Sequence, residues 1–489
     1  MRILEDMRQY IDRLCEEGEI QPIEAEVDWN LEIGAIIRRS NDLMAPAPFF
    51  QNISGYPSGF RILGAPASAS RRKGRFYSRI ALSLGFEPET RADQLIDALS
   101  RIMEKPRIPP RLLPTGPCKE CVFVGNEVDL FKLPAPYLHD GDGGRYIGTW
   151  HTVITRTPDK AWTNWGMYRL MISGQRALGG LIVPTQHIGM HYDLWRGAGQ
   201  DMPFAVALGT DPVTSLLSSM SIPDGVDEAD IVGGYRGKPL DVVRCETVDL
   251  EVPASAEIVI EGTVSLTETC MEGPFGEYTG YISNSQKQRP VFKVSAITHR
   301  KDPILPVVCP GEPVDDHLCM SLSLAADALA LLRKKSIPVV MTFIPSEAAL
   351  HLLVVSVDKS QWQGDSIAHA VGEAIWSAKI GTLLPKIILV DRDIDPTEIG
   401  KVLWAFATKC HPQHGIATFP NRDIFPLTPY LYPEEKRDRK CTMVVFDCTW
   451  PSVWPQDYAP RKAGFDSLWP LAMQERVLDS WPRYGYRAN

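Results

Sequence analysis

Residues 257–281, EIVIEGTVSL-TETCM-EGPFGEYTGY, join a strand pattern to a turn-rich segment. In residues 257–266, Val, Ile and Leu alternate with smaller or polar residues, which predicts a β-strand. Farther along, Glu272 and Glu277 stand five positions apart, with two glycines and a proline between them. Glycine permits positive φ and close backbone approach, and proline restricts its neighbours. We therefore expect a shaped loop that carries two carboxylates; the alternative is a surface turn with two solvated glutamates.

The β pattern extends across the middle of the chain. Short runs rich in Val, Ile and Thr are separated by Gly, Pro and Asp turns, a pattern typical of an antiparallel, barrel-like domain. We expect strands in residues 150–157, 169–173, 204–208, 240–251, 257–266 and 291–299.

The C-terminal part has a different pattern. A long apolar helix is expected over residues 317–335, and the strands that follow alternate with helices, which predicts an α/β layered domain. The expected strands are residues 338–343, 352–357 and 386–390, and the expected helices are residues 366–379 and 398–408.

The N-terminal part begins with an amphipathic helix, and a second helix and a strand are expected near residues 36–39 and 49–50. A proline-rich stretch, residues 105–117, indicates a linker. The apolar side of the first helix carries Leu4, Met7, Ile11 and Leu14.

These changes of pattern predict an α/β, multidomain fold class with a central barrel. The end of the chain forms an amphipathic helix around residues 471–480. Trp454, Trp469 and Trp481 are costly to leave in water, so we expect this tail to dock on another domain or on a second subunit. The predicted parts are an N-terminal α/β portion (1–117), a barrel-like domain (118–316), a C-terminal α/β domain (317–460) and the tail (461–489).

The composition narrows the classes of function. The 489 residues are 44% hydrophobic and 23% charged, as in ordinary globular proteins, and the net charge of -9 argues against nucleic acid or an anionic membrane as the main partner. No run of 18 apolar residues and no secretion signal is found, so the ten scattered cysteines suit a reducing cytoplasm. Cys118 and Cys121 form a lone CxxC without a second ligand pair, and we expect no chemical role for them.

Three polar segments of the barrel region could carry chemistry. They contain Asn164 with Arg169, His187, and Glu228. An amide oxygen, an imidazole and a carboxylate form a ligand set suited to manganese or magnesium. Each residue also has an ordinary alternative: a hydrogen-bonded histidine, a solvated acid or a salt-bridged arginine. Sequence spacing alone does not bring the three together, and no phosphate loop, GxGxxG or HExxH motif is present.

Taken together, these segments resemble the UbiD family of decarboxylases, which use prenylated FMN, and the ferulic acid and pyrrole-2-carboxylate decarboxylase branch in particular. The resemblance covers about nine tenths of the chain. It is carried by EGPFGEYTGY at 272–281, WTNWGMYR at 162–169, QHI at 186–188, PDGVDE at 223–228, ILGAP at 62–66, GPCKE at 116–120, DGGRY at 142–146, LWAF at 403–406, and FPL with PY at 425–430.

The resemblance implies a role for each matching residue. Glu277, Arg169 and Glu272 would form the catalytic network, with Glu277 as proton donor and Arg169 as carboxylate anchor. Asn164, His187 and Glu228 would hold Mn²⁺ or Mg²⁺, and Trp165, Ser218, Met220 and Glu228 would surround K⁺. The prenylated FMN would contact Asn164, Trp165, Gly166, Met167, Tyr168, Arg169, Gln186, His187, Ser218, Met220, Glu228 and Lys386.

The resemblance also implies a flavin-reductase-like split barrel, a homodimer or larger homo-oligomer, and a flavin prenyltransferase that supplies the cofactor. Its substrate pocket would include Tyr278, where the ferulate type has methionine, and Leu318, where threonine is usual. With Phe425 and Leu427 as an apolar wall, this pocket favours a flat aromatic or heteroaromatic acid. A cinnamic-type α,β-unsaturated acid is the alternative substrate.

Three other classes of function are open at this stage. An ordinary FMN oxidoreductase on a split barrel would need hydride transfer with unmodified FMN. A binding protein could keep the fold without catalysis, although the complete Glu272, Arg169 and Glu277 set argues against it. A metal hydrolase would need an open coordination position for water.

Overall fold

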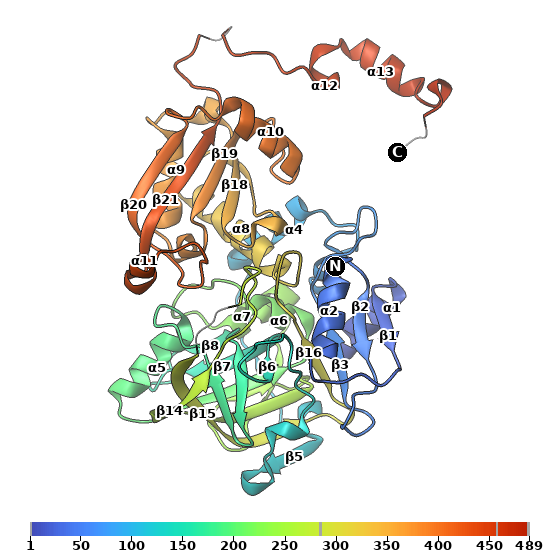
Figure 1. Ribbon diagram of the computed structural model, residues 1–489, viewed down its shortest axis with the longest axis vertical. Helices are drawn as coiled ribbons and strands as arrows, with labels where there is room; N and C mark the ends of the chain where they lie inside the picture. The colour runs from blue at the N-terminus through green and yellow to red at the C-terminus, as the bar shows by residue number, and fades with distance from the viewer. Residues whose placement is uncertain (1, 283–285, 456–457, 487–489) are drawn as a thin grey trace.

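The computed structural model describes residues 2–282, 286–455 and 458–486. An antiparallel sheet lies in the lower part of Figure 1, with the N-terminal portion beside it and the C-terminal α/β body above it. Its strands follow the order β6-β9-β10-β15-β14-β11-β7-β8, with β5 paired to β15, which confirms the predicted antiparallel barrel. The strands are β5 (Cys121–Val124), β6 (Tyr146–Gly148), β7 (His151–Arg156), β8 (Thr163–Gly166), β9 (Leu170–Gly174), β10 (Ala177–Gly180), β11 (Met202–Leu208), β14 (Ile258–Glu272) and β15 (Lys287–His299).

The long hairpin of β14 and β15 corrects one expectation. The strand predicted to end at Leu266 continues to Glu272, which pairs with Lys287, so Glu272 lies on a strand end and not within the following loop. The hairpin bends at Gly262, where the register shifts. A Cβ at Gly262 would lie 1.8 Å from the carbonyl oxygen of Lys293, so only glycine fits this close approach.

Three helices of the barrel domain were not predicted, and they deliver residues to one end of the sheet: α5 (His187–Gly197), α6 (Pro212–Leu217) and α7 (Glu228–Arg236). A small separate sheet pairs β4 (Arg111–Leu112), β12 (Asp241–Arg244) and β13 (Glu251–Pro253). The single strand expected over 240–251 is therefore two strands, and the proline-rich linker contributes β4 to the same sheet.

The N-terminal portion packs its first helix as predicted. In α1 (Met7–Glu16), Met7, Tyr10, Ile11 and Leu14 are buried, and the Asp6 side chain caps the helix. The sheet beside it has the order β1-β2-β3-β16, and β16 comes from a part of the chain that follows the barrel. The other elements are β1 (Ile20–Ile23), α2 (Glu32–Asp42), β2 (Ala47–Phe50), β3 (Arg61–Gly64), α3 (Ser78–Ser83), α4 (Ala92–Ser100) and β16 (Ile304–Val307).

The C-terminal body is the predicted α/β layer, with strand order β17-β18-β19-β21-β20 and parallel pairing at its centre. Helix α8 packs against α4, which connects this body to the N-terminal portion (Figure 1). The elements are α8 (Leu318–Lys334), β17 (Val339–Phe343), β18 (Leu352–Val357), α9 (Ile367–Trp376), β19 (Lys386–Asp391), α10 (Ile399–Lys409), β20 (Ile416–Asp423), α11 (Pro433–Asp438) and β21 (Lys440–Cys448).

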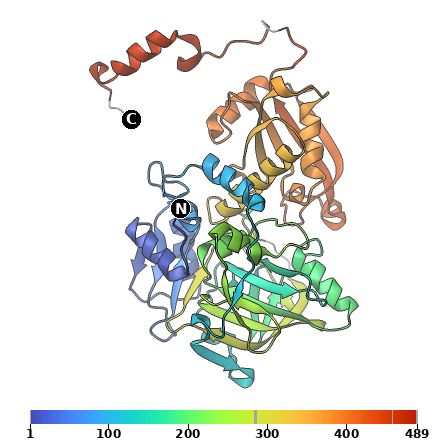
Figure 2. The same cartoon turned by 180° about the vertical axis from the view of Figure 1, so that it is seen from behind.

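The tail contacts this body through Lys462, which lies 3.5 Å from the Asp393 carboxylate. Helices α12 (Phe465–Leu468) and α13 (Leu471–Asp479) project away from the rest of the molecule in both views (Figures 1 and 2). Trp469 is 50% exposed and Leu471 is 68% exposed. Among the described residues, no helix combines the length and hydropathy that crossing a membrane requires.

Candidate functional site

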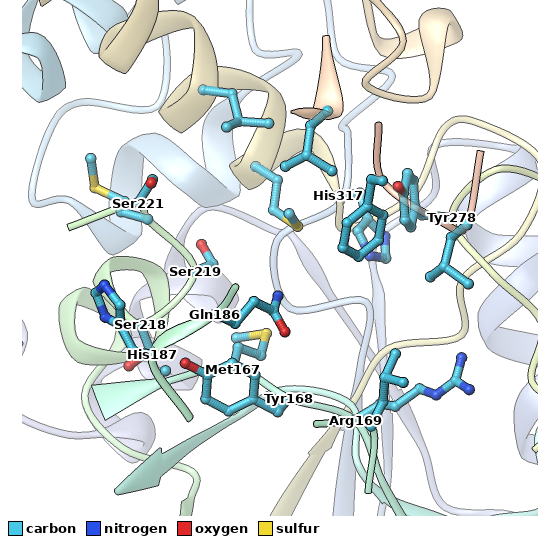
Figure 3. Close-up of a pocket in the computed structure, with 18 of the residues that line it drawn as sticks. Met167, Tyr168, Arg169, Gln186, His187, Ser218, Ser219, Ser221, Tyr278 and His317 are labelled. Atoms are coloured by element: carbon cyan, nitrogen blue, oxygen red, sulfur yellow. The ribbon is translucent and has the colours of Figure 1, made fainter. Parts of the chain in front are cut away.

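A cavity of about 300 Å³ lies where the barrel meets the C-terminal body. It collects side chains from β8, the start of α5, the segment after α6, the loop after β14, and α8 (Figure 3). Most residues predicted to contact the cofactor or the substrate line it: Asn164, Trp165, Gly166, Met167, Tyr168, Arg169, Gln186, His187, Ser218, Met220, Glu228, Glu277, Tyr278, Phe425 and Leu427.

The three predicted metal ligands converge at one end of this cavity. Asn164 lies on β8, His187 begins α5 and Glu228 begins α7. His187 Nδ1 lies 3.2 Å from Asn164 Oδ1 and 3.3 Å from Glu228 Oε1. Ligand atoms that share one octahedral cation at about 2.1 Å are about 3 Å apart, so this set fits a manganese- or magnesium-type ion.

The second nitrogen of the imidazole is also fixed. His187 Nε2 lies 2.9 Å from Asp224 Oδ1, and metal-binding histidines in proteins commonly have such a carboxylate contact on the nitrogen that does not bind the metal. On the inner side, the backbone N–H of Trp165 donates to Glu228 Oε2 at 2.7 Å. Burial and the neighbouring Glu228 carboxylate raise the pKa of Tyr168, so its hydroxyl stays protonated and donates to Asn164 Oδ1 at 3.3 Å.

The residues predicted to surround a monovalent cation lie beside this set. Ser218 follows α6, and its hydroxyl is buried between Thr152 Oγ1 and the Thr214 carbonyl oxygen, each at 2.8 Å. Met220 lines the cavity two residues later. Whether these groups hold K⁺ stays a prediction.

Arg169 connects Glu272, at the end of β14, with Glu277 in the loop that follows. Its Nε and Nη2 donate to Glu272 Oε1 and Oε2 at 2.9 and 3.1 Å, a bidentate pair, and its Nη1 donates to Glu277 Oε1. The Glu272 side chain is 1% exposed, whereas the Glu277 side chain is 11% exposed and lines the cavity. Glu272 is therefore a buried partner of Arg169, and Glu277 is the acid that a ligand can reach.

Hydrogen bonds that the sequence did not predict stabilise the segment that carries Glu272 and Glu277. The Tyr146 hydroxyl donates to Glu272 Oε1 at 2.9 Å, and the N–H of Gly276 donates to Asp142 Oδ1 at 2.9 Å. His139 Nδ1 lies 3.0 Å from the other oxygen of Asp142. Burial alone would lower the pKa of His139, but hydrogen bonds to Asp142 and Cys309 raise it to about 10. Asp142 and Tyr146 both belong to the DGGRY motif, so the family resemblance pointed to this segment but did not predict these hydrogen bonds.

The opposite wall of the cavity carries Tyr278 and an unpredicted histidine. The rings of Tyr278 and His317 lie side by side, 5.0 Å apart (Figure 3). His317 Nδ1 lies 3.0 Å from Asp315 Oδ1. Burial alone would lower the pKa of His317, but this carboxylate raises it above its usual value. Leu318 does not line the main cavity; it faces a small recess behind Tyr278.

Lys386 is the one predicted cofactor contact that lies elsewhere. It begins β19, and its ammonium lies 4.2 Å from the centre of the Tyr430 ring, outside the lining of the cavity. Burial lowers its pKa. Lys379 lines the cavity instead, and burial also lowers the pKa of its ammonium. The contact between Lys386 and a cofactor stays an untested prediction.

Three family models match consecutive parts of the chain. They describe the N-terminal, Rift-related and C-terminal domains of 3-octaprenyl-4-hydroxybenzoate carboxy-lyase, and they match residues 11–99, 111–313 and 317–448. The chain belongs to the UbiD family. This confirms the predicted family, the α/β multidomain fold class and the assignment to the carboxy-lyases.

Relatives from this family match almost end to end. The pyrrole-2-carboxylic acid decarboxylase of Pseudomonas aeruginosa is 40% identical over 487 residues, which cover 98% of both chains. Ferulic acid decarboxylase 1 of Saccharomyces cerevisiae is 36% identical and covers 99% of this chain and 98% of its own. Among solved structures, an evolved dimeric form of the UbiD-class enzyme HmfF from Pelotomaculum thermopropionicum, in complex with prFMN, is 26% identical, with a TM-score of 0.78 over 96% of this chain and 100% of that chain.

Proposed function

We propose that this UbiD-family protein catalyses the reversible, non-oxidative decarboxylation of an aromatic or heteroaromatic carboxylic acid with prenylated FMN. The observation that carries the proposal is the contact of one guanidinium, Arg169, with both Glu272 and Glu277 at the wall of the cavity. An arginine binds a planar carboxylate through two parallel N–H groups, and a neighbouring acid can deliver a proton to carbon.

Arg169, Glu272 and Glu277 would each have a separate role in the reaction. Arg169, held by the buried Glu272, attracts and orients the substrate carboxylate toward Glu277. Glu277 then gives its proton to the carbon that has lost CO₂, and takes a proton from that carbon in the reverse direction. The prenylated flavin, when bound, supplies the electron sink for the carbon–carbon bond cleavage. The aromatic wall of Tyr278 and Phe425 favours a flat ring beside these groups.

Asn164, His187 and Glu228 would hold the divalent ion that pairs with the flavin phosphate. A phosphate dianion needs compensating positive charge, and this acidic chain has no phosphate loop to supply it. Ser218 and Met220 would complete a neighbouring K⁺ site. A flavin prenyltransferase would supply the cofactor in the cytoplasm, where the ten free cysteines would stay reduced.

Replacing a ligand of the divalent ion is expected to release metal and flavin together. Glu228→Gln removes the charged oxygen that faces His187, so bound manganese and bound flavin should both fall at least ~10-fold. Elemental analysis and the flavin absorbance of the purified protein measure the two quantities. Asp230→Asn, on the same helix, is the matched control and should change neither bound manganese nor bound flavin. Loss of metal with full retention of flavin would contradict the proposed pairing of the ion with the flavin phosphate.

A substrate screen tests the proposed activity. Protein produced together with a flavin prenyltransferase should release CO₂ from at least one of the pyrrole, furan, indole and benzoic acids. Turnover restricted to cinnamic-type acids would favour the α,β-unsaturated alternative, which the resemblance to ferulic acid decarboxylase supports. Hydride transfer with unmodified FMN, without CO₂ release, would favour the oxidoreductase and reject the proposal.

The tail would mediate a homodimer. Its apolar side chains Trp469, Leu471 and Leu478 are at least half exposed, and burial of such surface contributes ~25 cal/mol per Å². Light scattering is expected to give a dimer or larger assembly for the full chain and a monomer or a weaker assembly for a chain that ends at residue 460. An unchanged assembly after truncation would show that another surface holds the subunits together.

A further inference from the structure

A second cavity, of about 500 Å³, shares no lining residue with the first. It lies between the N-terminal portion, which contributes Trp29, Tyr56 and Phe60, and the barrel segment around Phe123 and Phe131. Its volume is in the range of cavities that hold small organic ligands. Neither the proposed reaction nor the proposed cofactor site uses it.

A guanidinium with one nitrogen free of protein hydrogen bonds within the described residues lines this cavity. Arg145 Nε donates to the Ala135 carbonyl oxygen at 2.6 Å, and Nη2 donates to the Leu133 carbonyl oxygen at 3.0 Å and to the Tyr56 hydroxyl. The guanidinium carbon of Arg145, Cζ, lies 4.2 Å from the centre of the Trp29 ring. These contacts fix the plane of the group but neutralise none of its charge.

The remaining nitrogen, Nη1, is free to bind a ligand. Within residues 2–282, 286–455 and 458–486, no hydrogen bond to Arg145 Nη1 is found, and no carboxylate lies within 4.0 Å of the guanidinium. An arginine that is held in place without a counter-ion is preorganised for an anion, and a carboxylate can accept charge-assisted hydrogen bonds from Nη1.

The walls of the cavity select a flat ring. His299 lies between Phe60 and Phe123, at ring distances of 5.7 and 5.5 Å, and the Phe123 ring is stacked on it. Buried Ile297 and Leu133 complete the apolar lining. Aromatic rings stabilise one another in such offset and edge contacts, so a ligand ring would gain from these walls.

Three other charged side chains, Glu127, Asp129 and Lys132, also line the cavity. Glu127 and Lys132 are exposed, and their opposite charges compensate. Asp129 Oδ1 is turned toward the backbone N–H of Phe131, at 3.0 Å. Arg145 is therefore the cationic lining group that hydrogen bonds and the Trp29 ring hold in place, and its Nη1 favours an anionic ligand.

We propose that this cavity is a second ligand site, which binds a small aromatic or heteroaromatic carboxylate. The carboxylate would accept hydrogen bonds from Arg145 Nη1, and the ring would lie against Phe60, Phe123 and His299. A cationic aromatic amine is disfavoured by the same guanidinium. This inference does not rest on the decarboxylase activity, because it concerns binding at a different cavity.

A fluorine NMR titration of the cofactor-loaded protein with 4-fluorobenzoate tests the site. Two saturable binding events are expected, one in each cavity. Arg145→Met should weaken one of them at least ~10-fold and leave the other intact, because the charge-assisted hydrogen bonds from Nη1 are lost. Arg169→Met should have the opposite effect. Arg39→Met changes an exposed surface arginine and serves as the matched control.

A second variant and a neutral ligand test the same cavity independently of Arg145→Met. Phe60→Asp leaves Arg145 and its contacts in place but adds a negative charge to the wall, so it should also weaken the second event. The neutral isostere 4-fluorobenzamide should bind the second cavity at least ~10-fold more weakly than 4-fluorobenzoate. Absence from the wild type of any binding event that Arg145→Met weakens, or an event assigned to the second cavity that survives both Arg145→Met and Phe60→Asp in folded protein, would overturn the proposal. Failure to release CO₂ would leave this binding unchanged and would count against the proposed function alone.

Discussion

Glu277→Gln is expected to abolish CO₂ release while the protein keeps its fold and its bound flavin. Glutamine has nearly the same shape and can still accept the hydrogen bond from Arg169 Nη1, but it has no acidic proton to deliver. General acid catalysis contributes roughly 10²–10⁴-fold, so the rate of decarboxylation should fall by at least ~10²-fold. Steady-state CO₂ release and the flavin absorbance of the same sample measure both parts of this result.

The matched control for this variant lies on the same hairpin. Glu268 belongs to β14 and pairs with Lys293 on the surface, with its side chain 62% exposed. Glu268→Gln should leave turnover within about twofold of the wild type, since exposed ion pairs contribute little. Turnover in Glu277→Gln at a wild-type rate would remove Glu277 from its proposed role.

Arg169→Met should damage both activity and stability, for two separable reasons. The substrate loses its cationic anchor, and the buried Glu272 loses the partner that donates two hydrogen bonds to it. Leaving one member of a buried ion pair without its partner costs about 3–5 kcal/mol. We expect a lower free energy of unfolding by about that amount and a fall in kcat/KM of at least ~10²-fold. Denaturant unfolding and CO₂ release measure the two effects.

A double variant separates the two causes. Arg169→Met with Glu272→Gln removes the unpaired buried charge, so most of the lost stability should return while the activity stays low. Arg169→Lys keeps the charge but lacks the planar fork, so its activity should lie between those of Arg169→Met and the wild type. Recovery of turnover in the double variant would show that Arg169 acts through the fold and does not anchor the substrate.

Periodicity in the sequence predicted the elements that bury one regular face. The apolar side of α1 and the bounds of β18 were predicted correctly, because Met7, Ile11 and Leu14 follow a helical period and residues 352–357 are almost continuously apolar. The edge strand β20 was missed because it is largely exposed and contains Pro420. The pairing of β16 with β3 joins residues more than 200 positions apart, which no local pattern encodes.

The same distinction between local sequence patterns and contacts of distant residues applies to the site. The Glu272–Tyr281 segment looked unusual on its own, since glycine, proline and two acids rarely share a regular element. The meeting of Asn164, His187 and Glu228 came from the family resemblance, because their sequence separations carry no distance information. Tyr146 and His317 escaped prediction because their importance lies in what they contact: Glu272 in one case, and Tyr278 with Asp315 in the other.

Decarboxylation in D₂O by protein loaded with prenylated FMN, followed by NMR and by CO₂ release, tests the proposed proton transfer from Glu277. We expect one CO₂ released per product molecule, with a single deuterium at the carbon that carried the carboxylate. Glu277→Gln with the same cofactor should form neither product. Absence of CO₂ release across the aromatic, heteroaromatic and cinnamic acids, or equal turnover by wild type and Glu277→Gln, would contradict the proposed decarboxylation with Glu277 as proton donor.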